Sequence, residues 1–144
     1  MNGADLIVYR ERSVVDDQAL STLHRRSFGS PDTAVAPWQT RLERWSITWV
    51  SAYAGDRLLG LVNVAGDGGV HAFLLDPVVD PRRRHRGIGA ELVRRAAVAA
   101  RAAGCHWLHV DYEPHLADFY LGACGFRPTA AGLLHLAPGV PAVL

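Results

Sequence analysis

Apolar residues recur along the chain at two different spacings, and the pattern alternates between them. A spacing of three and four residues, typical of helices with one buried face, occurs around Leu20 and Leu23 and again from Ile88 onward. Runs of apolar and β-branched residues, typical of strands, lie between these segments. Helices are therefore expected over 17–28, 37–45, 89–103 and 114–124. Strands are expected over 6–10, 47–53, 58–65, 70–79 and 105–110.

Glycine and proline residues mark the boundaries of these elements. The Gly-Asp pair at 55–56 favours a hairpin between the second and third strands. Pro77 lies inside the strand expected over 70–79, and proline cannot donate a hydrogen bond to a neighbouring strand. A discontinuity in the sheet is therefore expected at Asp76–Pro77. The apolar tail, 133–144, is a candidate cover for a sheet edge or for a partner, and a homodimer is one such possibility.

Composition places the chain among globular domains and excludes several classes of function. With 144 residues, 49% of them hydrophobic, it is expected to form a single domain over 1–144 that needs no disulfide framework and no metal. A net charge of +1 gives no global field for nucleic acid or membrane surfaces. The sequence contains no secretory leader pattern and no apolar run of membrane-spanning length, so a cytoplasmic location is expected.

The segment 78–90 combines the end of a strand, an arginine-rich loop, two glycines and the start of a helix. An uncapped helix N-terminus presents free N–H groups and the positive end of the helix dipole, which favours a phosphate. The dinucleotide fingerprint is excluded because Leu92 stands where its third glycine belongs, and the P-loop is excluded because the chain has no lysine. The segment therefore predicts a phosphate-bearing cofactor rather than a solvated basic turn or a nucleic-acid patch.

The spacing Arg84-x-x-Gly87-x-Gly89 resembles the pyrophosphate signature of the GCN5-related N-acetyltransferase (GNAT) family. The order of elements from Ser46 onward is similar to that family as well, down to a tyrosine, Tyr120, ahead of a Gly-Phe pair at 125–126. The resemblance implies a GNAT-like α/β fold, in which a mixed, mostly antiparallel sheet is splayed between its fourth and fifth strands and flanked by helices.

The same resemblance implies that acetyl-CoA is bound as the acyl donor, without a metal. Backbone groups near Val78 and Val79 would pair with its pantetheine arm where the sheet splays open. The pyrophosphate would be held by the loop and the start of the helix. The residues implied for that role are Arg84, His85, Arg86, Gly87, Ile88, Gly89 and Ala90.

Acyl transfer to an amine needs a proton acceptor for the amine and a proton donor for the departing thiolate. Tyr120 matches the tyrosine that protonates the CoA sulfur in the family, and its alternative is a core aromatic. Glu113 stands where many members have asparagine, and Glu113 or His115 could accept the amine proton. The alternatives are a helix cap for Glu113 and a surface position for His115. His71 and Asp76, on the strand expected over 70–79, are further candidates that rank below Tyr120.

The resemblance thus predicts an N-acetyltransferase in which a primary amine attacks the thioester of acetyl-CoA directly. The acceptor would be a small-molecule amine or a peptide or protein amine, and the acceptor region has no pattern that identifies it. The alternative is a non-catalytic domain that binds or senses acyl-CoA, which the unusual Glu113 would allow.

Overall fold

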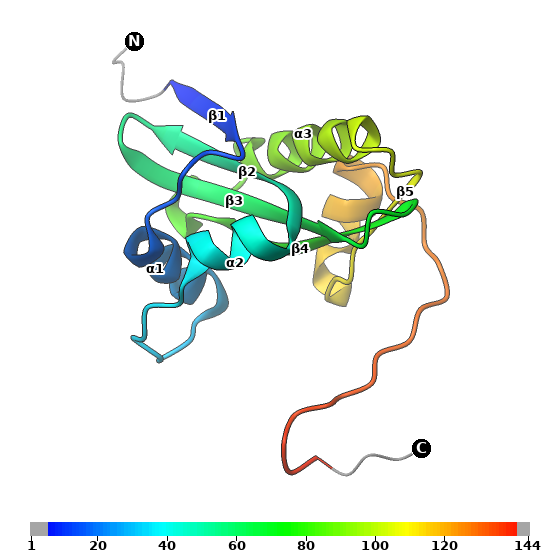
Figure 1. Ribbon diagram of the computed structural model, residues 1–144. Coiled ribbons are helices and arrows are strands. Elements are labelled where there is room, and N and C mark those ends of the chain that lie inside the picture. Colours follow the sequence, from blue (N-terminus) through cyan, green and yellow to red (C-terminus); the bar gives the residue numbers. More distant parts are fainter. Residues whose placement is uncertain (1–5, 141–144) are drawn as a thin grey trace.

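The computed structural model describes residues 6–140 and consists of a five-stranded sheet with helices on both faces (Figure 1). The strands are β1 (Ile7–Glu11), β2 (Ser46–Ala54), β3 (Arg57–Gly66), β4 (His71–Val79) and β5 (Trp107–His109). The helices are α1 (Asp17–Phe28), α2 (Trp38–Trp45) and α3 (Ile88–Ala102). Two 3-10 turns, η2 (Pro81–Arg83) and η3 (Pro114–Leu116), and the π-helix η4 (Asp118–Ala123) complete the fold.

The sheet follows the order of the strands in the sequence, from β1 to β5. The first four strands pair antiparallel, and β5 pairs parallel to β4, so the predicted mixed, mostly antiparallel sheet is confirmed. The β4–β5 ladder extends only from His71 and Trp107 to Phe73 and His109. Beyond Phe73 the two strands separate, which confirms the splay. β5 is shorter than the strand expected over 105–110.

The predicted discontinuity in β4 is a β-bulge. Leu61 pairs with Val78 and Asn63 pairs with Leu75, so two residues of β4, Asp76 and Pro77, oppose a single residue of β3. Asp76 has a φ of 53°, a left-handed conformation that is uncommon for residues other than glycine. The bulge lies within the part of β4 that has separated from β5.

Two apolar layers hold the sheet from opposite sides. On one side α3 packs its buried face, centred on Leu92 and Ala96, against β2, β3 and β4. On the other side α1 and α2 bury Leu20 and Leu42 with Trp49 of β2. The alanines of α3 let that helix lie close to the strands. The helices thus leave the splayed edge of β4 between the two layers.

The ends of the helices have local causes. α1 begins after Asp16, whose side chain accepts a hydrogen bond from the Ala19 N–H at 2.8 Å, and it ends at Gly29 in the left-handed conformation. α2 begins one residue later than expected because Pro37 occupies its cap position. None of the helices within 6–140 has the length and the apolar character needed to cross a membrane.

Two expectations about the C-terminal part need correction. The single helix expected over 114–124 is divided into a 3-10 turn and a π-helix, because Cys124 donates its N–H to the Phe119 carbonyl five residues earlier. The described part of the tail forms no strand and covers no sheet edge, since Leu133 and Leu136 are 92% and 80% exposed. Residues 141–144 lie outside the described residues.

Candidate active site

The loop between β4 and α3 has the backbone geometry of an anion cradle. α3 begins after Gly87, which has a φ of 80° and leaves the helix without a side-chain cap. His85, two residues earlier, also has a positive φ, of 62°. Positive φ at nearby positions of a loop can turn N–H groups towards one point, as in known anion-binding nests. A Cβ added at Gly87 would meet no atom within 4 Å, so this side of the loop is open.

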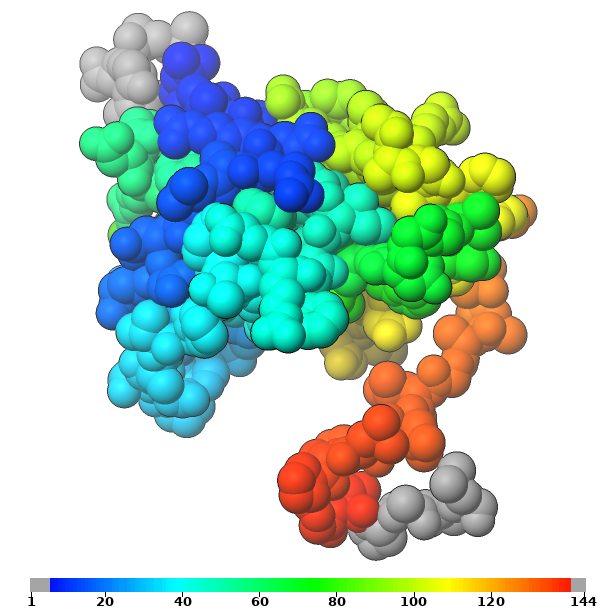
Figure 2. All heavy atoms as spheres, in the orientation of Figure 1, coloured from blue at the N-terminus to red at the C-terminus, as the bar shows by residue number. Residues whose placement is uncertain are grey.

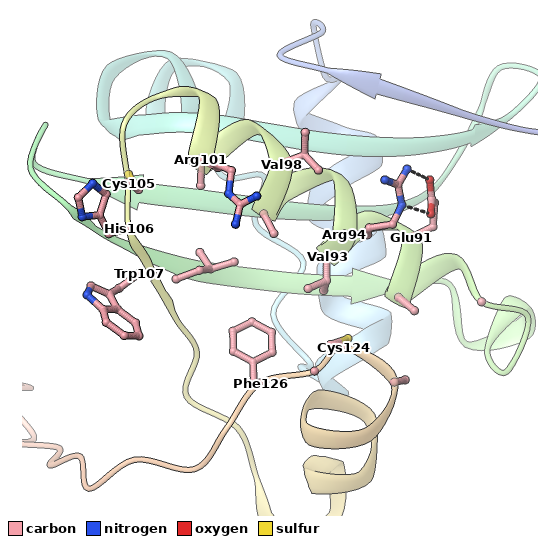
Figure 3. Close-up of a pocket in the computed structure, with 17 residues that line it drawn as sticks. Glu91, Val93, Arg94, Val98, Arg101, Cys105, His106, Trp107, Cys124 and Phe126 are labelled. Carbon is pink, nitrogen blue, oxygen red and sulfur yellow. Dashed lines mark hydrogen bonds and ion pairs between the residues drawn. The ribbon is translucent and has the colours of Figure 1, made fainter.

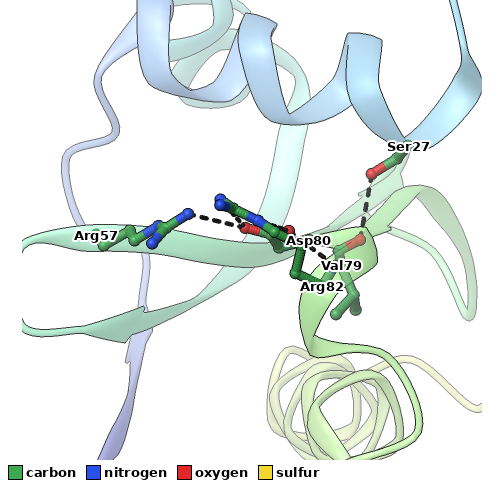
Figure 4. A network of polar contacts seen from close by, with 5 residues as sticks. All are labelled: Ser27, Arg57, Val79, Asp80 and Arg82. Carbon is green, nitrogen blue, oxygen red and sulfur yellow. Dashed lines mark hydrogen bonds and ion pairs between the residues drawn. The ribbon is translucent and has the colours of Figure 1, made fainter. Parts of the chain in front are cut away.

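Asp80 fixes the first turn of the loop from a buried position (Figure 4). Its carboxylate accepts a hydrogen bond from the Arg82 N–H at 3.0 Å and forms ion pairs with Arg82 at 3.2 Å and Arg57 at 3.6 Å. The guanidinium of Arg82 is therefore already paired within the loop. Arg84 and Arg86 are exposed and form no ion pair within the described residues, so their charges face solvent.

Where the sheet splays, the backbone of β4 presents groups that do not pair with β3. The Asp80 N–H donates to the Leu59 carbonyl at 2.7 Å, and the same ladder register pairs Val79 with Gly60. Because bonding alternates along an antiparallel ladder, the peptide groups of Val79 point away from β3, whereas those of Val78 point towards it. Accordingly, the Ser27 hydroxyl donates to the Val79 carbonyl at 3.3 Å (Figure 4).

Tyr120 lies in the apolar core beside the splay. Its ring stacks on Tyr112, with ring centroids 5.4 Å apart, and meets Phe119 and Phe126 edge to face. Burial, and secondarily Cys124, raises the pKa of Tyr120 to about 12. Its hydroxyl forms no hydrogen bond within 6–140. The structure therefore retains the alternative of a core aromatic while leaving the phenolic O–H free to donate.

The π-helix η4 connects Tyr120 with the cradle. A Cβ added at Gly89 would lie 3.1 Å from Phe119 Cζ and 3.6 Å from Val79 Cγ2. Gly89 is therefore the point at which η4, the start of α3 and the end of β4 meet. A larger residue at Gly89 would first displace Phe119, so its effect on phosphate binding could not be separated from its effect on packing.

Glu113 and His115 lie at η3, which follows β5 along the chain. Both are exposed, and neither side chain forms a hydrogen bond or an ion pair within the described residues. Glu113 occupies the cap position of η3 without bonding to it. The structure thus places both near the start of the segment that carries Tyr120, without a partner that would orient them.

At the bulge of β4, polar side chains from four elements come together. Asp76 Oδ2 pairs with Arg41 of α2 at 2.6 Å and accepts a hydrogen bond from Asn63 Nδ2 at 3.4 Å. His24 Nε2 of α1 lies 3.5 Å from Asp76 Oδ1. The sequence drew attention to Asp76 but not to His24 or Arg41. The one available signal was that His24 follows Leu20 by four residues, on the face of α1 that packs inward.

A groove of about 720 Å³ lies between α3 on one side and β5 with the end of η4 on the other (Figure 3). It starts beside the cradle, at Gly87 and Ala90, and passes the ion pair of Glu91 with Arg94. Its far end is bordered by Trp107. The cradle therefore opens onto a larger space than the loop alone encloses. Within 6–140 no three potential metal-ligating side chains come together.

Comparison with known proteins gives consistent matches. The model of the acetyltransferase (GNAT) family matches residues 17–126. Mycothiol acetyltransferase of Mycobacterium avium (strain 104) is 34% identical over 100 residues, which cover 65% of this chain and 31% of that protein. The chain spans about a third of the length of the curated relatives it matches.

Solved structures agree with this chain in fold. Glucosamine-6-phosphate N-acetyltransferase from Arabidopsis thaliana superposes with a TM-score of 0.74 at 15% identity, covering 92% of this chain and 99% of that one. An aminoglycoside N-acetyltransferase in complex with CoA superposes with a TM-score of 0.71 at 17% identity, covering 92% and 95% of the two chains. At these identities the likeness concerns the fold alone.

Proposed function

The chain belongs to the acetyltransferase (GNAT) family, and on that premise we propose that it transfers the acetyl group of acetyl-CoA to a primary amine. The amine would attack the thioester directly, within one domain formed by residues 1–144. The observation that carries the proposal is the uncapped start of α3, which opens beside the free edge of β4. Such an arrangement fits a ligand that combines a pyrophosphate with an extended amide-bearing arm.

The residues of the loop fit the donor. The N–H groups of 85–90 would hold the pyrophosphate, and Arg84 and Arg86 are free to pair with its phosphates. Val79 would pair with the pantetheine arm, in exchange for its present bond from Ser27. Val78 lies alongside, within the ladder to β3. When bound, acetyl-CoA supplies an acyl group activated as a thioester.

Tyr120 is proposed as the proton donor. Burial keeps its hydroxyl protonated far above neutral pH, since its pKa is raised to about 12. The sulfur of an intact thioester is a weak base, whereas the departing thiolate is a much stronger one. The phenol would therefore donate its proton only as the C–S bond breaks. Glu113 and His115 remain predictions for the proton acceptor. A small-molecule amine is the proposed acceptor class, which is supported by relatives named for mycothiol and glucosamine 6-phosphate.

The donor site can be tested by thermal unfolding with acetyl-CoA, CoA and ATP. A ligand at 100 times its dissociation constant should stabilise the fold by about 2.7 kcal/mol. His85→Gly keeps a residue that readily adopts positive φ, whereas His85→Val places a β-branched residue there. Both variants lose the imidazole, so the difference between them reports the effect of the backbone conformation at position 85 on ligand binding.

Stabilisation by acetyl-CoA and CoA that survives in His85→Gly and weakens in His85→Val is the expected result. Absence of any shift in the wild-type protein would refute the donor site. Tyr120→Phe then separates an enzyme from a sensor: an enzyme loses turnover on an amine panel while its CoA-induced shift stays. Binding without turnover on any amine would favour the non-catalytic acyl-CoA domain instead.

A further inference from the structure

The bulge of β4 faces the position that the reacting acyl group would occupy. Val79 lies beside the cradle, and Asp76 is three residues back along the strand, roughly 10 Å at the rise of a β-strand. A donor held by its pyrophosphate at Gly87 and extended along the free edge of β4 therefore brings its acyl end to the bulge. This step rests on the proposed function.

The acceptor has one open side from which to reach that point. On the α3 side, Phe119 and the start of α3 close against Val79. On the other side, Phe73 and Leu75 of β4 are about half exposed, at 48% and 43%. In Figure 2 the green surface, which includes the turn before β4, lies uncovered beside α2 in cyan. An amine therefore approaches the bulge from the side of α1 and α2, where Asp76 and its partners lie.

Asp76 is held as an oriented carboxylate. Its left-handed backbone is costly for a residue with a side chain, and such strain persists where the surrounding structure enforces it. Arg41 fixes Oδ2 at 2.6 Å, and the guanidinium of Arg41 is itself placed over the Trp38 ring, 4.2 Å from its centroid. Oδ1 is left to face His24.

His24 has the surroundings of a working base rather than of a core histidine. Its ring packs against Phe28 and Trp38, with centroids 4.6 Å and 5.1 Å away, so its orientation is fixed. Its Nε2 faces Asp76 Oδ1 at 3.5 Å, and the side chain remains about one third exposed. The charged groups that face it are Asp76 from β4 and, behind that, Arg41 from α2. An oriented imidazole with a carboxylate partner and access to solvent is the usual form of a general base.

We propose that His24 takes the proton of the attacking amine and that Asp76 positions its ring. The nitrogen lone pair forms the new C–N bond, the C–S bond breaks, and its electron pair leaves on sulfur. The amine proton passes to a ring nitrogen of His24, and the thiolate takes a proton from the Tyr120 hydroxyl. His24 then releases its proton to solvent, and Tyr120 is reprotonated from solvent. Asp76 stabilises the imidazolium while it exists and is a positioning residue.

The test compares His24→Gln and Asp76→Asn with a matched control, His106→Gln, which removes an exposed histidine at the far end of α3. His24→Gln should lower kcat by about 10²-fold or more and leave the CoA-induced thermal shift intact. The pH dependence of the wild-type rate should be lost in this variant. Imidazole in solution should restore turnover to His24→Gly but not to Tyr120→Phe.

Asp76→Asn should lower kcat more than it raises KM, without rescue by imidazole, since the ring is present but not oriented. Wild-type turnover in His24→Gln would overturn this inference but not the proposed function. Loss of the pH dependence in Glu113→Gln or His115→Gln instead would identify one of those residues as the proton acceptor. A wild-type protein that binds CoA but acetylates no amine would overturn the proposed function, and this inference with it.

Discussion

The role proposed for Tyr120 is compatible with its place in the apolar core. Its ring makes three aromatic contacts, and the surrounding side chains leave it 3% exposed. The same burial that anchors the ring raises the pKa of its hydroxyl to about 12. A core role and a proton-donating role are therefore compatible, because only the oxygen is required for the second.

The raised pKa of Tyr120 predicts a loss of stability in alkaline solution. A tyrosine in the unfolded chain ionises near its ordinary pKa of 10.0, whereas the folded one keeps its proton until about pH 12. Between these values the unfolded state binds fewer protons, so the free energy of unfolding falls as pH rises. Thermal unfolding should show Tyr120→Phe losing fewer degrees of Tm than the wild type between about pH 8 and 11. Equal losses in both proteins would mean that Tyr120 ionises while folded.

Some residues proposed for the site could be identified from the sequence, whereas those that meet only in the folded protein could not. Arg84, Gly87 and Gly89 could be singled out because they are near neighbours and their spacing carries meaning. His24 and Asp76 lie 52 positions apart, and they meet only because α1 docks on the face of the sheet opposite to α3. No local sequence pattern indicates that these two residues are in contact, so the pair could be identified only from the folded structure.

At the scale of elements, α3 depends on close contact with the sheet at Gly60. A Cβ there would lie 2.9 Å from Leu92 Cδ1 and 3.0 Å from the Val78 carbonyl oxygen. The leucine can move, but the carbonyl belongs to the β3–β4 ladder and cannot. Gly60 therefore sets how near α3 lies to the strand that leads into the cradle.

Gly60→Ala is expected to lower the free energy of unfolding by about 1 to 3 kcal/mol, measured by urea denaturation. Gly122→Ala is the matched control, because a Cβ at Gly122 would meet no atom within 4 Å. The control should be neutral or slightly stabilising, as alanine restricts the unfolded chain more than glycine does. A Gly60→Ala protein as stable as the control would mean that α3 can shift without cost.

The boundaries of most elements could be predicted because local residues set them. The helix over 17–28 agrees with its prediction, and strands β2, β3 and β4 differ from theirs by one or two residues, since glycines and caps interrupt the patterns there. The bulge at Asp76–Pro77 followed from the missing proline N–H. The π-helix could not be predicted, because its apolar spacing over 118–123 is also compatible with an ordinary α-helix.

At the scale of the whole molecule, charge is unevenly distributed despite a net value of +1. Four arginines lie within 82–86, and Asp80 neutralises only the first of them. The cradle end is therefore positive, while the Glu91 carboxylate pairs with the next arginines along α3. A polyanionic ligand would be attracted towards the loop from outside contact distance.

The affinity for CoA should accordingly fall as salt is raised from about 0.05 to about 0.5 M, measured by calorimetry. A double variant, Arg84→Gln with Arg86→Gln, should bind more weakly at low salt and show a flatter dependence. Arg101→Gln, at the other end of α3, removes the same kind of charge away from the cradle and should retain the wild-type dependence. Identical slopes in all three would show that backbone N–H groups alone hold the phosphates.

The wide turn of η4 makes the arrangement around Tyr120 sensitive to the smallest change in gene length. A π-turn contains one residue more than the α-helical turn it replaces, as the bond from the Cys124 N–H to the Phe119 carbonyl records. Loss of a single codon within 121–123 would leave this segment one residue short, so its ends could keep their places only if the wide turn tightened to an α-helical one. Tightening would redirect the side chains of η4, including the Tyr120 ring, whose centroid lies 5.9 Å from that of Phe126. An in-frame deletion could thus disrupt the aromatic packing around Tyr120 even though every residue proposed for the site was still present.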